Sequence, residues 1–124
     1  MDAHAIAIDV ATRFLDEESA PDEGRFVFAY TVRIRNRGDV AARLVERHWI
    51  ITDANGRVEE VRGPGVVGEQ PVLQPGASFE YTSGCPLPTP FGSMRGTYQM
   101  VGQGGDRFDA EIAPFGLTEP HSLH

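Results

Sequence analysis

RFVFAYTVRIRN, residues 25–36, is the stretch that decides the fold of this chain. Its apolar side chains fall on every second position, and these are Phe26, Phe28, Tyr30, Val32 and Ile34. Arg33 and Arg35 stand between them, on the opposite side of an extended backbone. A period of two predicts a β-strand with one buried face and one face that meets water in its second half.

The same alternation recurs along the chain in shorter sets. These sets lie within residues 6–14, 79–81, 94–100 and 108–112. Turn-forming segments separate the sets, at residues 16–24, 37–39, 55–56 and 74–76. Asn55-Gly56 is the clearest of these turns, because both residues tolerate positive φ and so favour a tight hairpin. The pattern predicts six to eight short antiparallel strands.

Residues 40–53 are ambiguous. Leu44 falls on the even face of a strand, whereas Val45, Trp49 and Ile51 fall on the odd face. A β-bulge or a bend near residues 44–46 reconciles the two sets. A helix over residues 40–47 is the competing interpretation.

Short strands joined by turns at fairly regular spacing are typical of a sandwich. We therefore predict an all-β protein with an immunoglobulin-like or fibronectin type III-like antiparallel β-sandwich. Trp49 is expected to anchor the core. The single Cys85 cannot form an internal disulfide, so an antibody-type domain is excluded.

Composition narrows the class of function. The 124 residues suffice for a single domain over residues 1–124, with a flexible tail from about residue 118. The formal charge of −7 argues against nucleic-acid binding. All basic residues are Arg, which excludes a P-loop lysine or a Schiff-base lysine. No signal peptide or membrane-spanning segment is recognisable, so we expect a cytoplasmic protein without membrane insertion.

The stretch VRGPGVVGEQP, residues 61–71, has the G-x-G-x-x-G spacing of a dinucleotide-binding loop. That loop requires a helix after the glycines, with its N-terminus facing the pyrophosphate. Pro71 and Pro75 follow instead, and no apolar residues recur there at helical spacing. The sequence therefore predicts a surface loop in which glycines permit positive φ or close backbone approach.

Three blocks carry a family resemblance. Residues 47–100 contain HWIITD, the glycine loop and SGCPLPT in order, with FVFAYTVRIRN before them and RFDAEIAPFGL after them. Together they resemble the ApaG family over nearly the whole chain. The resemblance implies a fibronectin type III-like sandwich and a role in Co²⁺ and Mg²⁺ homeostasis. It also implies pyrophosphate or nucleotide binding as an alternative, and protein interaction as the usual role of eukaryotic relatives.

Two candidate binding sites follow. Arg62, Gly63, Gly65 and Gly68 could bind phosphate through backbone amides and a guanidinium, although acidic residues nearby oppose an anion. Residues 85–91 contain three prolines and cannot form a central strand, so Leu87 and Phe91 could form an exposed docking patch. The alternative is that Leu87 and Phe91 fold back and cover one end of the sandwich.

Catalysis and metal binding have weaker candidates. Covalent catalysis would need Cys85 or a serine with a positioned base. A Cys85–His48 pair is possible in space, but the sequence gives it no support. Asp53, Glu59 and Glu60 flank one hairpin and could offer oxygens to a cation. We predict no metal site, no cofactor and no catalytic residues, with phosphate-ester or pyrophosphate hydrolysis as the enzymatic alternative. The predicted function is a non-enzymatic binding module whose partner is another protein, with homodimers also open through edge strands.

Overall fold

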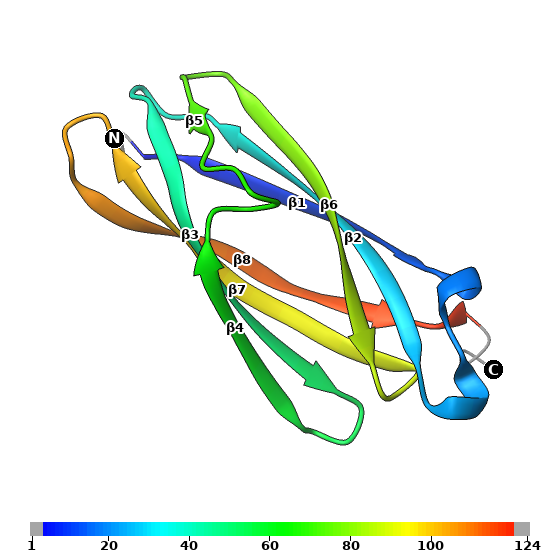
Figure 1. Ribbon diagram of the computed structural model, residues 1–124. Helices are drawn as coiled ribbons and strands as arrows, with labels where there is room; N and C mark the ends of the chain where they lie inside the picture. The colour runs from blue at the N-terminus through cyan, green and yellow to red at the C-terminus, as the bar shows by residue number, and fades with distance from the viewer. Residues whose placement is uncertain (1–3, 121–124) are drawn as a thin grey trace.

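Two antiparallel β-sheets pack face to face in the computed structural model, which describes residues 4–120 (Figure 1). The strands are β1 (Ile6–Phe14), β2 (Phe26–Asn36), β3 (Ala42–Asp53), β4 (Val58–Pro64), β5 (Val72–Leu73), β6 (Ser78–Leu87), β7 (Phe91–Gly102) and β8 (Arg107–Thr118). One sheet has the order β1-β2-β6. The other has the order β4-β3-β7-β8, and β5 also pairs with β3. The predicted all-β antiparallel sandwich is confirmed.

Strand β2 forms the middle of the three-stranded sheet, as its alternation predicts. Val32 and Ile34 are fully buried between the sheets, while Arg33 and Arg35 are exposed on the outer side. The first half of β2 is buried on both sides, because Leu15 covers Val27 on the outer face. Leu15 precedes two short 3₁₀ turns, Asp16–Glu18 and Pro21–Glu23, which replace the simple loop expected there.

The core between the sheets is rich in aromatic rings. Trp49 is only 2% exposed and makes edge-to-face contacts with Tyr30, Tyr98 and Phe115, at ring-centroid distances of 5.3, 6.3 and 5.9 Å. Such contacts add to the stabilisation that burial alone provides. Trp49 therefore anchors the core, as its place in the sequence indicates.

Strand β3 contains the predicted bulge. Its pairing with β7 shifts between Leu44 and Glu46, which leaves Val45 as the extra residue. The alternative helix over residues 40–47 is wrong, because these residues form a strand of the five-stranded sheet. The bulge has a role, since the Val45 carbonyl accepts hydrogen bonds from the Gly65 amide at 2.8 Å and from the Gln70 side chain at 2.9 Å. It thereby holds the glycine loop.

The β3–β4 hairpin turns at Asn55-Gly56, as predicted. Gly56 has φ +83°, and the Asp53 carboxylate accepts hydrogen bonds from the amides of Asn55 and Arg57 at 2.8 and 3.0 Å. Asp residues stabilise turns in this way because their short side chains reach the backbone two residues on.

The structure describes the chain up to residue 120, just past the predicted start of the tail at about residue 118. Strand β8 runs to Thr118, and the amide of buried Glu119 donates to the Pro90 carbonyl at 2.8 Å. His121 and His124 of the predicted tail lie outside the described residues. Within residues 4–120, no helix is long and apolar enough to span a membrane.

Candidate functional site

Gly63, the first glycine of the motif, makes room for an arginine. It lies in β4 directly opposite Arg47 of β3. A Cβ atom on Gly63 would stand 2.9 Å from Nη2 of Arg47, which is too close for any real contact. Nη1 of Arg47 donates to the carbonyls of Pro64 and Gly65, both at 2.9 Å. Gly63 thus allows the guanidinium to lie against the backbone that leads into the loop.

Gly65 and Gly68 provide backbone conformations that other residues adopt only with strain. Gly65 has φ +57°, and a Cβ atom there would stand 2.1 Å from the Glu69 carbonyl oxygen. Gly68 has φ +81° but has open space around it. Between them, Val66 and Glu69 exchange backbone hydrogen bonds of 2.8 and 2.9 Å, which closes a tight turn. Loop geometry therefore accounts for both glycines.

The structure does not gather the four predicted phosphate-binding residues around one point. The amides of Gly65, Val66 and Glu69 already donate to backbone carbonyls. Arg62 stands opposite His48 in the ladder, two residues after Glu60, whose Oε1 lies 2.7 Å from His48 Nε2. Since alternate residues share a face, Arg62 lies with Glu60 and His48 on the outer face of the sheet. Phosphate binding by this loop stays a prediction.

The structure confirms that the glycine motif is not a dinucleotide-binding loop, as the prolines after it predict. Strand β4 leads into the glycines, as in a nucleotide-binding unit, but the short strand β5 follows them. No helix N-terminus faces the loop, so the backbone feature that holds a pyrophosphate in such folds is missing from this region of residues 58–73.

Leu87 and Phe91 do not form a common exposed patch. Leu87 is the last residue of β6, pairs with Phe26 and is only 4% exposed, so its prediction as an exposed docking residue is wrong. The reason is that residues 85–87 continue β6, which lies at the edge of its sheet, where Pro86 is tolerated. Phe91 begins β7 and is 49% exposed, so it remains available to a partner.

Cys85 and His48 lie on opposite sides of the five-stranded sheet. The Cys85 side chain is buried in the core, its Sγ donates to the Pro86 carbonyl at 3.8 Å, and burial raises the pKa of the thiol to about 11. His48 contacts Glu60 on the outer face. At neutral pH the thiol is protonated and His48 lies on the far face of the sheet, which is unfavourable for a nucleophile.

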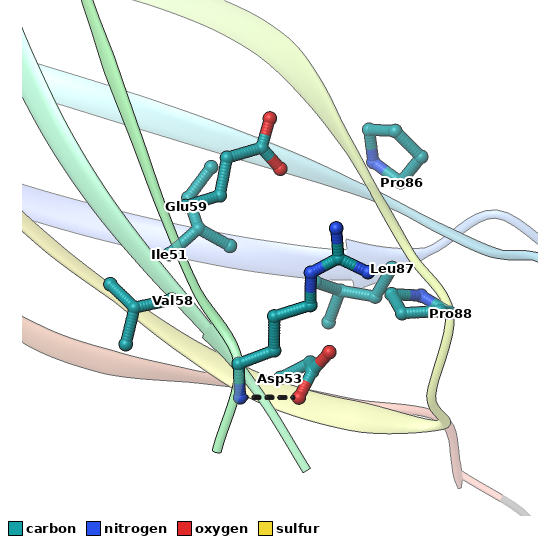
Figure 2. Close-up of a pocket in the computed structure, with 8 residues that line it drawn as sticks. Ile51, Asp53, Val58, Glu59, Pro86, Leu87 and Pro88 are labelled. Carbon is teal, nitrogen blue, oxygen red and sulfur yellow. Dashed lines mark hydrogen bonds between the residues drawn. The ribbon is translucent and has the colours of Figure 1, made fainter. Parts of the chain in front are cut away.

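The three carboxylates that the sequence offered for a cation, those of Asp53, Glu59 and Glu60, do not lie together. Asp53 caps the β3–β4 turn and Glu60 contacts His48 on the outer face. Glu59 lies on the other side of β4 from Glu60, at a cleft between the hairpin and the end of β6. Figure 2 places the carboxylates of Glu59 and Asp53 at different ends of that cleft. No group of three His, Cys, Asp or Glu side chains within residues 4–120 could hold a metal ion.

The cleft itself was not anticipated from the sequence. It has a volume of about 420 Å³ and lies between Ile51 and Glu59 of the hairpin and Pro86, Leu87 and Pro88 (Figure 2). Its position depends on how the two sheets are stacked, which no local pattern reveals. The inward position of Arg47, by contrast, can be predicted from the sequence, because Arg47 alternates in β3 with the core-facing residues Trp49 and Ile51.

The outer face of the five-stranded sheet carries most of the large exposed apolar side chains. Val58, Val72 and Phe91 are 57%, 47% and 49% exposed. Val58 and Val72 pair with Thr52 and Arg43 of β3, on the side of the sheet that points away from the core. Val72 and the neighbouring Val101 lie at the Arg43 end of β3, whereas Val58 and Phe91 lie near its Thr52 end, nine residues or about 30 Å away. We call these two groups together the apolar outer face.

Comparison with known proteins gives a consistent result. A family model for the ApaG domain matches residues 16–102. The Protein ApaG of Stenotrophomonas maltophilia is 60% identical over 123 residues, which cover 99% of this chain and 97% of that protein. The Protein ApaG of Pseudomonas aeruginosa PAO1 is 58% identical over 121 residues, covering 98% and 96%. A crystal structure of a Bordetella pertussis protein named ApaA is 56% identical, has a TM-score of 0.92 and covers 94% of this chain and 95% of that chain. The chain therefore belongs to the ApaG domain family.

Proposed function

We propose that this protein is a non-enzymatic binding module that docks onto another protein through the apolar outer face. The observation that carries the proposal is the contrast between the two outer surfaces of the sandwich. The five-stranded sheet exposes Val58, Val72 and Phe91 to solvent. The two apolar groups lie at opposite ends of this face, and a partner that covers either group would remove apolar surface from water, which is typical of protein-interaction sites.

The outer surface of the three-stranded sheet is polar by comparison. Arg33 and Arg35 are exposed there, and the hydroxyls of Thr31 and Thr82 form a cross-strand hydrogen bond of 2.8 Å. Hydrated charges and satisfied hydroxyls have little to gain from a partner. The same molecule thus offers a matched control surface.

The buried Cys85 supports the non-enzymatic part of the proposal. Its thiol holds its proton at neutral pH, and His48 lies on the far side of the sheet. We propose that the role in Co²⁺ and Mg²⁺ homeostasis, which the family resemblance implies, is exerted in the cytoplasm through the partner protein.

Pyrophosphate or nucleotide binding by residues 62–68 is the alternative proposal. It has less geometric support, because the amides of Gly65 and Val66 bond to backbone carbonyls and Arg62 shares a face with His48.

Co-purification from a cell extract tests the main proposal. Val72→Asp and Phe91→Asp should each remove the co-purifying partner, because a charge in an apolar contact is costly to desolvate. Thr82→Asp, on the polar surface, should retain it. All three side chains are exposed, so the melting temperatures should stay close to that of the parent protein. Equal retention in all three variants would contradict the proposal.

A further inference from the structure

A second cavity lies between the two sheets, beside the cleft of Figure 2. Its volume is about 230 Å³, and it shares Ile51, Glu59 and Pro86 with that cleft. Val61 and Met94 provide apolar wall on the five-stranded side. The space is comparable to cavities that accept small organic molecules. This cavity is separate from the apolar outer face, which lies on the opposite side of the five-stranded sheet.

Arg47 places an unpaired positive charge at this cavity. It is half-buried, and Nη1 donates to two backbone carbonyls at 2.9 Å. No carboxylate pairs with it among the residues that the structure describes, and Nε and Nη2 have no further partner there. A guanidinium with two spare donor atoms fits the planar, bidentate geometry of a carboxylate.

Trp49 adds an aromatic wall to the cavity. Its ring lines the cavity, and its indole Nε1 is buried without a hydrogen-bond partner in the part of the chain described. Buried polar groups are usually satisfied, and each exception has an energetic cost. The hydroxyl-bearing side chains of Tyr30 and Ser83 line the same space. The inner part of the cavity is therefore lined by aromatic rings, by hydroxyl groups and by the positive charge of Arg47.

Glu59 limits how much negative charge a ligand can bring. It pairs with Ile51, four residues along β3 from Arg47, which is a separation of about 13 Å between Cα positions. Its charge reaches the cavity, since it is the second cause of the raised pKa of Cys85. A second anionic group on the ligand would meet this carboxylate and be repelled.

We propose that the inter-sheet cavity binds a compact apolar monocarboxylate, with Arg47 holding the carboxylate and Ile51, Val61 and Met94 contacting the apolar body. One negative charge satisfies the guanidinium, and the apolar remainder fits the walls beside Glu59. Phosphate and pyrophosphate, with more than one charge, are disfavoured.

The fluorescence of Trp49 offers a direct test, because it is the only tryptophan of the chain. The probes are 4-methylvalerate, its neutral amide and inorganic phosphate, titrated into the full-length protein up to about 10 mM. We expect a saturable emission change with 4-methylvalerate and at least about tenfold weaker binding of the amide and of phosphate. An absent response to 4-methylvalerate, or equal binding of the amide or phosphate, would overturn the proposal.

Two variants, Arg47→Met and Ser83→Leu, test whether these residues form the site, and Arg62→Met is the control. Arg47→Met keeps the apolar stem and should weaken 4-methylvalerate binding by at least about tenfold, whereas Arg62→Met, on the outer face, should leave it unchanged. Because Arg47 also bonds to the glycine loop, Ser83→Leu provides a second route: it fills the cavity and leaves Arg47 in place. Unchanged affinity in Arg47→Met or in Ser83→Leu would place the ligand elsewhere. Co-purification of the protein partner should be the same in both variants, which separates this site from the apolar outer face.

Discussion

Gly65 and Gly68 belong to the same motif but are constrained to different degrees. Both have positive φ, which costs a residue with a side chain about 1–2 kcal/mol. Gly65 has in addition the Glu69 carbonyl oxygen 2.1 Å from the position of a Cβ atom, whereas Gly68 has nothing within 4 Å. The spacing of glycines in the sequence predicts a loop, but only the surroundings of each one tell which is indispensable.

A pair of alanine substitutions measures this difference. We expect Gly68→Ala to lower the free energy of unfolding by about 1 kcal/mol, from backbone strain alone. Gly65→Ala should lower it by about 3 kcal/mol or more, because the clash with backbone adds to the strain. Urea denaturation of both variants checks the prediction. Equal effects would mean that the backbone at residues 65–69 yields easily.

At the scale of strands, period-two alternation proved sufficient for β2 and its neighbours. The Asn55-Gly56 hairpin and the bulge at residues 44–46 were also predictable, since each depends on residues close in sequence. Residues 85–87 were misjudged because proline excludes a central strand but not an edge strand. Whether β6 lies at an edge depends on the strand order, which is a property of the whole sheet.

The end of β6 supplies a contrast between a core and a surface position. Leu87→Ala should cost about 2–4 kcal/mol, since it opens a cavity against Phe26 and Gly92. Phe91→Ala removes a half-exposed ring and should change stability by less than about 1 kcal/mol. Thermal or urea unfolding of the two variants distinguishes them. A larger loss for Phe91→Ala would reverse the assignment of the two side chains.

At the scale of the whole molecule, the β-sandwich could be predicted from the sequence, but the cavities between the two sheets could not. The inward position of Arg47 can be read from its alternation with Trp49. The cavity beside it cannot, because Ser83 and Pro86 of β6 come from the other sheet. Likewise, the apolar outer face joins Val58, Val72 and Phe91 from three separate strands. Sites of this kind depend on long-range pairing.

The buried ionisable side chains of the core predict how the free energy of unfolding depends on pH. Burial raises the pKa of Cys85 to about 11 and raises the pKa of Tyr30, Tyr81 and Tyr98 above the ordinary tyrosine value. Such groups hold their protons more tightly when folded, so their stabilisation is complete below the unfolded pKa and is lost as the pH rises through the folded pKa. The free energy of unfolding should therefore be steady up to about pH 9 and fall above it, by roughly 2 kcal/mol from Cys85 alone by pH 11.

Denaturation curves across this pH range, with Cys85→Ala as control, check the prediction. The variant should lose less stability between about pH 9 and 11, while the contribution of the tyrosines remains. All three tyrosines of the chain are affected, so native protein should show little tyrosinate absorbance near pH 10. Ordinary tyrosine titration in the folded protein would contradict the buried positions.

Photo-cross-linking in living cells shows whether the apolar outer face binds another protein. A photoreactive phenylalanine derivative is placed at Val72 or Phe91 and, as controls, at Arg33 or Thr82 on the polar surface. We expect a discrete adduct with a different protein from positions 72 and 91 and none from the control positions. An adduct of twice the mass of this chain would indicate a homodimer and contradict a separate partner. Adducts from the polar surface alone, or none from any position, would contradict binding by the apolar outer face.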